Sequence, residues 1–255
     1  MAEKTIDVTA LGELLIDFTE NGTSAQGNPI LEVNPGGAPC NVLAMLQKLG
    51  KEDVDEDLIR SSRIFHFGTL SSTHEGVREA TRYAIDVAKE AGDLISFDPN
   101  LRPPLWSSLD DAKKEIEYGL AKCDILKISD NEVEFLFGTT DYDLGAKLLK
   151  EKYNIPLILI TLGPDGSRAY YKDMRVEVAP FLQDNTIETT GAGDTFCASS
   201  LNYVLEHDLN HLTEENLKEL LTFANAAASL ITTKKGALKV MPEKEEVLAF
   251  IASRS

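Results

Sequence analysis

Short apolar runs recur along the chain and alternate with longer stretches of helical spacing. The β-rich runs cover residues 6–11, 64–67, 94–97, 125–128 and 157–161. Because consecutive positions in these runs are apolar, they predict strands of a parallel sheet that is covered on both faces. The intervening stretches carry apolar residues at helical spacing, most clearly at 42–49 and 77–88.

The last third of the chain has a different pattern. Residues 168–171 and 174–178 predict a hairpin that turns at Lys172 and Asp173, and the pattern after it is mostly helical. The whole pattern predicts one α/β domain over residues 1–255, built as a three-layer sandwich around a mostly parallel sheet. Two further β-like runs, 15–19 and 30–34, lie outside the alternation and predict an excursion that covers a site.

Composition narrows the class of protein. With 255 residues, 43% of them hydrophobic and 26% charged, the chain can bury a substantial core. No apolar run approaches the roughly 20 residues of a membrane helix, and the start lacks the pattern of a signal or transit peptide, so we expect a cytoplasmic protein. Three widely spaced cysteines, Cys40, Cys123 and Cys197, predict reduced core thiols.

Charge argues against two kinds of partner. The net charge of -17 repels nucleic acid and anionic membrane surfaces over most of the protein. A phosphate-bearing ligand would then need local attraction from oriented N–H groups, a helix N-terminus or Mg²⁺.

The clearest candidate for such a site is the segment ETTGAGDTF at residues 188–196, which precedes an apolar helix. Gly191, Ala192 and Gly193 would line the N-terminus of that helix, where unpaired N–H groups and the helix dipole suit a phosphoryl oxygen. Asp194 would face the same space. The residues alone leave a second interpretation open, in which Asp194 only caps the helix and the glycines only permit a tight turn.

This segment resembles, almost letter for letter, the second signature of the PfkB-type (ribokinase-like) carbohydrate kinases. The resemblance implies that Gly191, Ala192 and Gly193 form an anion hole and that Asp194 takes the proton from the sugar hydroxyl. It also implies a ribokinase-like α/β/α sandwich with a small β lid, and ATP and Mg²⁺ as cofactors. Residues 15–34 would be a reduced form of that lid.

Three other segments imply where the sugar binds. NPGGAPCN at 34–41 resembles the first signature of the family, while GELLIDF at 12–18 and SFDPNLRPPLW at 96–106 resemble fructokinases, the group within the family to which the chain is most similar. Each segment alone could equally be a turn or a strand end. The resemblance implies a set of substrate-binding residues: Asp17, Gly36, Gly37, Asn41, Asn100 and Arg102.

Nucleotide and metal residues follow further along the chain. KISDNE at 127–132 resembles the motif whose glutamate, here Glu132, organises the hydrated Mg²⁺, although Ser129 stands where many relatives have asparagine. Glu188 replaces an aspartate that is linked to a monovalent-cation site, which leaves activation by K⁺ in doubt. The resemblance implies these ATP-binding residues: Ser129, Thr161, Gly163, Gly166, Asn225 and Gly236.

One block of the family pattern is missing after Gly50. Family members carry there a strand, a helix, a further strand and two lid strands, whereas here the acidic stretch 51–57 leads directly to the strand near Ile64. The loss would leave the 15–34 hairpin with unpaired edges, so a homodimer through this hairpin is expected. It also predicts that ATP binding outlasts efficient turnover.

These observations favour an ATP-dependent sugar kinase. The first substrate to consider is D-fructose, phosphorylated at a primary hydroxyl to fructose 6-phosphate. The alternatives are 2-keto-3-deoxygluconate or another sugar, or a nucleotide-binding regulatory homologue that lost activity with the missing block. A Rossmann dehydrogenase is disfavoured because the first strand lacks G-x-G-x-x-G, and a Walker-type P-loop is also absent.

Overall fold

The computed structural model describes residues 4–11, 15–23, 29–36, 56–73, 75–236 and 240–254. The predicted helix at 42–49 lies outside these residues, as do Cys40, Gly37 and Asn41. Side chains are described for residues 4–11 and from residue 59 onward, except in two short gaps around residues 74–77 and 237–239.

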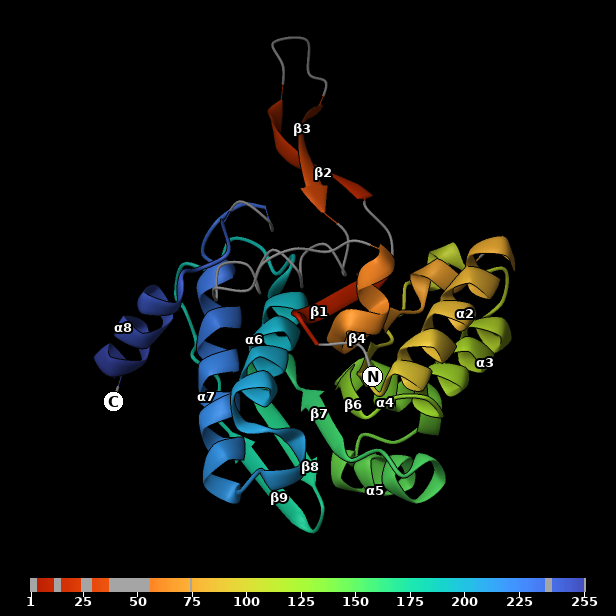
Figure 1. Ribbon diagram of the computed structural model, residues 1–255. Coiled ribbons are helices and arrows are strands. Elements are labelled where there is room, and N and C mark those ends of the chain that lie inside the picture. The colour runs from red at the N-terminus through yellow and green to blue at the C-terminus, as the bar shows by residue number, and fades with distance from the viewer. Residues whose placement is uncertain are drawn as a thin grey trace.

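Seven strands form the central sheet, in the order β1-β4-β5-β6-β7-β8-β9 (Figure 1). The strands from β1 to β7 pair in parallel, and β8 and β9 continue the sheet as an antiparallel hairpin. All five predicted sheet strands and the predicted hairpin are confirmed. The strands are Ile6–Leu11 (β1), Ser62–Gly68 (β4), Leu94–Asp98 (β5), Ile125–Ser129 (β6), Leu157–Thr161 (β7), Ser167–Tyr171 (β8) and Met174–Val178 (β9).

Helices cover both faces of this sheet, which confirms the three-layer sandwich (Figure 1). On one face lie α2 (Glu75–Ala91), α3 (Leu109–Leu120), α4 (Asp130–Phe137) and α5 (Tyr142–Tyr153). The other face carries α6 (Ala192–His207) and α7 (Glu214–Ile231), with α8 (Lys244–Arg254) packed on α7. Short 3₁₀ helices cover Glu56–Ser61, Leu70–Ser72, Pro103–Leu105, Gly163–Asp165 and Leu209–His211.

The central strands β6 and β7 supply side chains to two separate cores. Ile125 of β6 belongs to the core under α6 and α7, whereas Leu126 belongs to the core under α2 to α5. Leu157 and Ile158 of β7 divide in the same way. Because successive strand residues point to opposite faces, this alternation fixes which side chains face α6.

A row of polar residues crosses the α6 face of the sheet at the same alternation. His66 lies two residues after Ile64, and Lys127 lies two residues after Ile125, both on the α6 side. His66 Nδ1 is 2.9 Å from Ser96 Oγ, and both residues are buried. Burial, assisted by the charge of Lys127, lowers the pKa of His66 to about 3, so this imidazole is neutral.

A second, two-stranded sheet is formed by β2 (Leu15–Thr23) and β3 (Pro29–Gly36). The strands pair antiparallel, with a register irregularity between Glu20 and Thr23. Figure 1 shows this hairpin projecting away from the sandwich. The two β-like runs at 15–19 and 30–34 are thus confirmed as paired strands, and their role as a lid stays a prediction.

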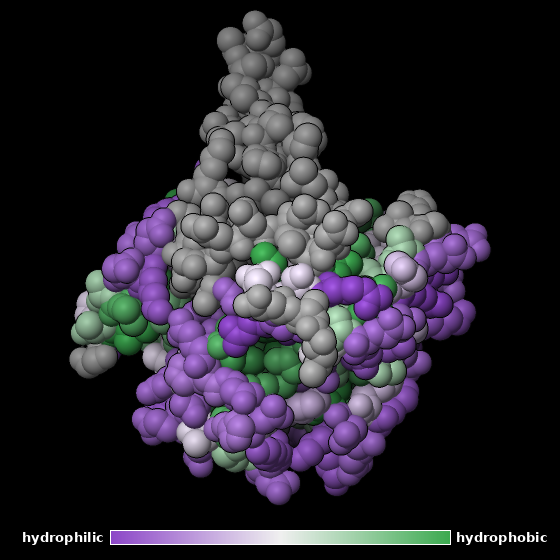
Figure 2. All heavy atoms as spheres, in the orientation of Figure 1, coloured by the Kyte–Doolittle hydropathy of each residue, from purple (hydrophilic) through white to green (hydrophobic). Residues whose placement is uncertain are grey.

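Hydrophilic residues dominate the described surface in Figure 2, around a hydrophobic patch in the middle of the view. Within the described part of the chain, no helix combines the length and the apolar character needed to cross a bilayer.

Candidate active site

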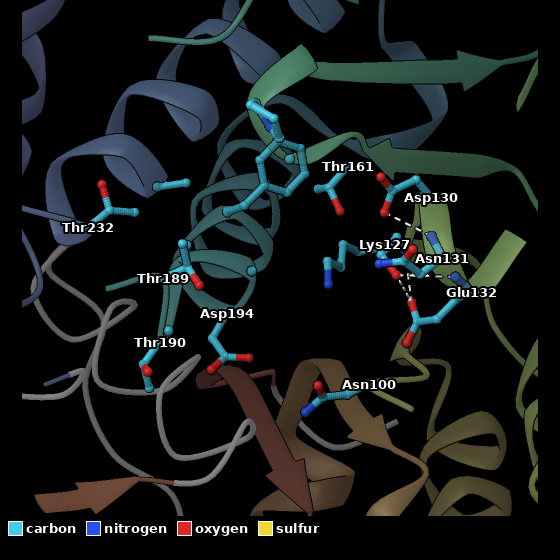
Figure 3. A pocket seen from close by; sticks show the side chains of 18 of the residues that line it. Asn100, Lys127, Asp130, Asn131, Glu132, Thr161, Thr189, Thr190, Asp194 and Thr232 are labelled. Atoms are coloured by element: carbon cyan, nitrogen blue, oxygen red, sulfur yellow. Dashed lines mark hydrogen bonds between the residues drawn. The ribbon is translucent and has the colours of Figure 1, made fainter. Parts of the chain in front are cut away.

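A cavity of about 1300 Å³ opens at the carboxyl ends of β5, β6 and β7, where ligands bind in open α/β sheets. The first turn of α6 forms one wall, and the loop after β5 and the first turn of α4 form the opposite wall (Figure 3). The cavity brings together twelve of the predicted residues: Asn100, Arg102, Ser129, Glu132, Thr161, Gly163, Gly166, Gly191, Ala192, Gly193, Asp194 and Asn225.

The wall at α6 is the N-terminus of a helix capped by glycine. Gly191 is the N-cap and has a φ of 78°, a left-handed conformation that glycine adopts without a steric penalty. The N–H of Thr195 donates to the carbonyl of Gly191 over 2.8 Å and starts the helical hydrogen-bond ladder. The N–H of Ala192 donates to the carbonyl of Thr189 over 3.1 Å, and the N–H groups between Ala192 and Thr195 have no acceptor within the helix, so an anion in the cavity suits this first turn. Asp194 lies in this first turn.

The loop after β5 turns sharply into the opposite wall. Asn100 has a φ of 47°, and its N–H donates to Asp98 Oδ1 over 3.2 Å. Arg102 is exposed and lines the cavity, and its Nη1 donates to the carbonyl of Leu101 over 3.3 Å. The positions of Asn100 and Arg102 are compatible with the predicted sugar contacts.

Glu132 is buried at the start of α4 and accepts several hydrogen bonds. Its Oε2 accepts from the N–H and the hydroxyl of Ser129, over 2.8 and 2.9 Å, and forms a capping box with that residue. Its Oε1 accepts from the N–H of Leu101 over 2.8 Å. The carboxylate therefore joins the start of α4 to the loop that carries Asn100 and Arg102.

Lys127 is the functional candidate that the sequence motifs did not single out. It is only 7% exposed, and its Nζ lies 3.0 Å from Oδ2 of Asp98, which is 2% exposed. Burial acts to lower the pKa of Lys127, but Asp98 and then Glu132 more than offset it, so the pKa is raised above its usual value and the ammonium stays charged. A lysine in the otherwise apolar run ILKI at 125–128 was the signal available in the sequence.

The remaining wall is formed by β7, the turn after it and α7. Gly166 has a φ of 93°, and a Cβ there would lie 2.3 Å from the carbonyl of Val178, so only glycine fits. The amide of Asn225 accepts from Ser167 Oγ over 2.8 Å and donates to the carbonyls of Val178 and Ala179. Asn225 thus stabilises the wall, and its predicted contact with the nucleotide stays a prediction.

Two groups of predicted residues are not placed at this cavity. Gly236 is buried, and its N–H donates to Glu188 Oε1 over 2.6 Å, but it is not among the described residues that line the cavity. Asp17 pairs with Asn34 across the β2–β3 hairpin, and Gly36 ends β3. Their assignment to the sugar stays a prediction, as does that of Gly37 and Asn41.

The described residues contain no cluster of three or more His, Cys, Asp or Glu side chains that could hold a metal ion by itself. Mg²⁺ in nucleotide sites commonly keeps several waters and is bound by phosphate oxygens with one or two carboxylates. Asp130 and Glu132 both line the cavity and fit such an outer role.

A cavity at the carboxyl ends of parallel strands, with a glycine-capped helix N-terminus and an aspartate beside it, is an α/β site suited to a phosphate-bearing ligand. The chain belongs to the pfkB family of carbohydrate kinases, whose sequence profile matches residues 51–244. It is 35% identical to the probable fructokinase-2 of Arabidopsis thaliana over 314 aligned positions, which cover 96% of this chain and 95% of the relative. Because 314 positions exceed the 255 residues of this chain, part of that relative has no counterpart here.

Solved structures agree with the fold. The fructokinase of Xylella fastidiosa with bound ATP superposes with a TM-score of 0.86 at 22% identity, covering 98% of this chain and 99% of that one. A double-mutant fructokinase of Vibrio cholerae O395, with fructose, ADP and a potassium ion bound, gives a TM-score of 0.83 at 22% identity and covers 98% and 100%.

Proposed function

We propose that this chain is an ATP-dependent fructokinase, which transfers the γ-phosphoryl group of ATP to a primary hydroxyl of D-fructose. The observation that supports this most directly is the position of Asp194, in the glycine-capped first turn of α6 at the edge of the cavity. Full-length similarity to a plant fructokinase adds the substrate class.

The residues suggest a division of roles. Asp194 takes the proton from the sugar hydroxyl as that oxygen forms its bond to the γ-phosphorus, and the bond between this phosphorus and the β–γ bridging oxygen breaks to release ADP. The N–H groups at Gly191, Ala192 and Gly193 stabilise the charge on the transferred group. Mg²⁺, when bound with Glu132 and Asp130 nearby, supplies positive charge to the phosphates.

ATP occupies the side formed by Ser129, Thr161, Gly163 and Gly166, and the sugar occupies the side nearer Asn100 and Arg102 in this proposal. Both sides meet at Asp194, as in-line transfer requires. The expected cytoplasmic location stays a prediction.

A coupled assay of ADP production over a panel of sugars tests the proposal, with ATP binding measured in parallel by calorimetry. D-Fructose should support turnover, and 2-keto-3-deoxygluconate tests the alternative acid substrate. ATP binding without turnover on any sugar would favour the regulatory homologue instead. Glu188 stands at the position linked to a monovalent-cation site, and one of its carboxylate oxygens already accepts the N–H of Gly236. Repeating the assay with tetramethylammonium in place of K⁺ therefore tests whether potassium activates the enzyme.

A further inference from the structure

Lys127 lies at the point where the polar row of the sheet meets the first turn of α6. A Cβ built on Gly193 would lie 3.1 Å from Lys127 Nζ and 3.7 Å from its Cε, so a side chain at position 193 would crowd the lysine. Gly193 is helical and needs no left-handed backbone, in contrast to Gly191. The close approach of Lys127 is therefore a physical reason for glycine at this position.

The position of the ammonium is fixed from the opposite side by Asp98. Their atoms are 3.0 Å apart, and both side chains are less than a tenth exposed. A buried ion pair is a weak source of stability, because desolvation of two charges offsets much of their attraction. A stabilising role alone therefore does not account for a lysine that also lines the cavity.

The charged side chains that line the cavity indicate what Lys127 can bind. Among the described residues that line it, the cationic side chains are Lys127 and Arg102, against the carboxylates of Asp130, Glu132 and Asp194. Arg102 is exposed, whereas Lys127 is buried. Figure 3 shows Lys127 extending into the pocket between Asp194 and Glu132. A phosphoryl group that approaches Asp194 therefore meets one buried cation.

We propose that the ammonium of Lys127 binds a non-bridging oxygen of the phosphoryl group during transfer, and acts as the charged member of the anion hole at Gly191–Gly193. Asp98 is the positioning residue that holds Nζ against Gly193. This inference rests on the proposed kinase function. It adds a side-chain cation to the backbone N–H groups, which by themselves carry only partial charges.

The test compares a neutral pair with the native ion pair. Lys127→Met alone would leave the Asp98 carboxylate buried without its partner, so Asp98→Asn is combined with it. The matched control is Lys122→Met with Asp86→Asn, which removes a surface pair at 2.9 Å that does not line the cavity. Far-UV circular dichroism and thermal melting establish that each double variant is folded.

The readout is calorimetric ADP binding with Mg²⁺ and D-fructose, with and without aluminium fluoride as the phosphoryl mimic. Aluminium fluoride should tighten ADP binding to the native chain and to the control, and this gain should fall by about 10² in the Lys127→Met, Asp98→Asn variant. ADP binding without the mimic should change little. Turnover should fall by a similar factor.

Three outcomes would overturn the inference. The gain could survive in the neutral pair, the mimic could add nothing to ADP binding by the native chain, or ADP binding could weaken equally with and without the mimic. Failure of the native chain to bind ADP at all would instead reject the proposed function. If the neutral pair does not fold, Lys127→Gln removes the positive charge but keeps a hydrogen-bond donor for the Asp98 carboxylate, and full retention of the gain in that variant would equally reject the role of Lys127.

Discussion

Oε1 of Glu132, in the first turn of α4, accepts a hydrogen bond from the N–H of Leu101 over 2.8 Å, across 31 positions of the chain. The other carboxylate oxygen closes the capping box with Ser129. One buried side chain thereby fixes the relative position of two cavity walls, one of which carries Asn100 and Arg102.

Glu132→Ala should lower the free energy of unfolding by about 2–4 kcal/mol, because two part-buried N–H groups, of Ser129 and Leu101, lose a buried carboxylate acceptor. Glu134→Ala is the matched control on the exposed face of the same helix and should change stability by less than about 0.5 kcal/mol. Urea unfolding at pH 7.5 measures both. Equal stability of the two variants would show that Glu132 does not anchor the loop.

Asp194→Asn should reduce turnover by roughly 10² to 10⁴ and leave ATP affinity near its native value, since the amide keeps the shape of the side chain but cannot take a proton. Asp184→Asn, at an exposed position that does not line the cavity, is the control. Steady-state kinetics and calorimetry separate the two effects. Native turnover in Asp194→Asn would remove this residue from the role of base.

Gly191→Ala should combine backbone strain with a loss of activity. The φ of 78° costs an L-residue about 1–2 kcal/mol, and relief of that strain would move the N–H groups of the first turn. Gly138 has a φ of 65°, with open space around its position at the end of α4, so Gly138→Ala should lose similar stability without losing turnover. Equal loss of turnover in both variants would contradict the anion-hole assignment.

Stability should fall with acidification because of His66. The folded pKa of about 3 lies below the ordinary value of 6.5, so the unfolded chain binds a proton that the folded chain excludes. His66 does not lower the free energy of unfolding well above pH 6.5. As the pH falls from 6.5 toward 3, protonation of the unfolded chain lowers this free energy progressively, and the loss is about 1.4 kcal/mol at pH 5.5.

His66→Gln removes this titration, so its stability should decline less between pH 7.5 and pH 5.5 than that of the native chain. The control is His211→Gln, at an exposed position. Denaturant unfolding at the two pH values gives the slopes. Parallel slopes for the native chain and His66→Gln would mean that the pKa of His66 is the same in the folded and the unfolded chain.

The sequence predicted the sheet well because its strands are buried on both faces and read as continuous apolar runs. Asp194 and its glycines could be predicted for a similar reason, since both the helix start and the phosphate chemistry are local in the chain. The pairing of Lys127 with Asp98 could not, because it joins side chains of neighbouring strands and depends on sheet register and on which face each side chain takes. The resemblance assigned Asn225 to ATP, but local sequence did not predict that its amide bonds to β8 and to the end of β9, because those partners lie 47 or more positions away in the chain.

The last prediction concerns the β2–β3 hairpin. In the described part of the chain these two strands form a sheet of their own, and a two-stranded ribbon is marginally stable alone. Each strand has one edge that its partner does not pair, and such edges offer N–H and C=O groups to another chain. We therefore expect concentration-dependent dimerisation in which hairpins of two copies pair edge to edge.

Proline at position 16 or 33 tests this expectation, because Ile16 and Val33 lie in opposite strands and proline removes a backbone donor. The variant whose N–H faces outward should weaken the dimer, whereas the one whose N–H faces the hairpin partner should disrupt the hairpin itself. Sedimentation velocity over a wide concentration range measures the first effect, and limited proteolysis of the hairpin measures the second. A native chain that sediments as a monomer throughout, with a hairpin resistant to protease, would show that the ribbon is stabilised within one chain, and edge pairing between copies would then be excluded.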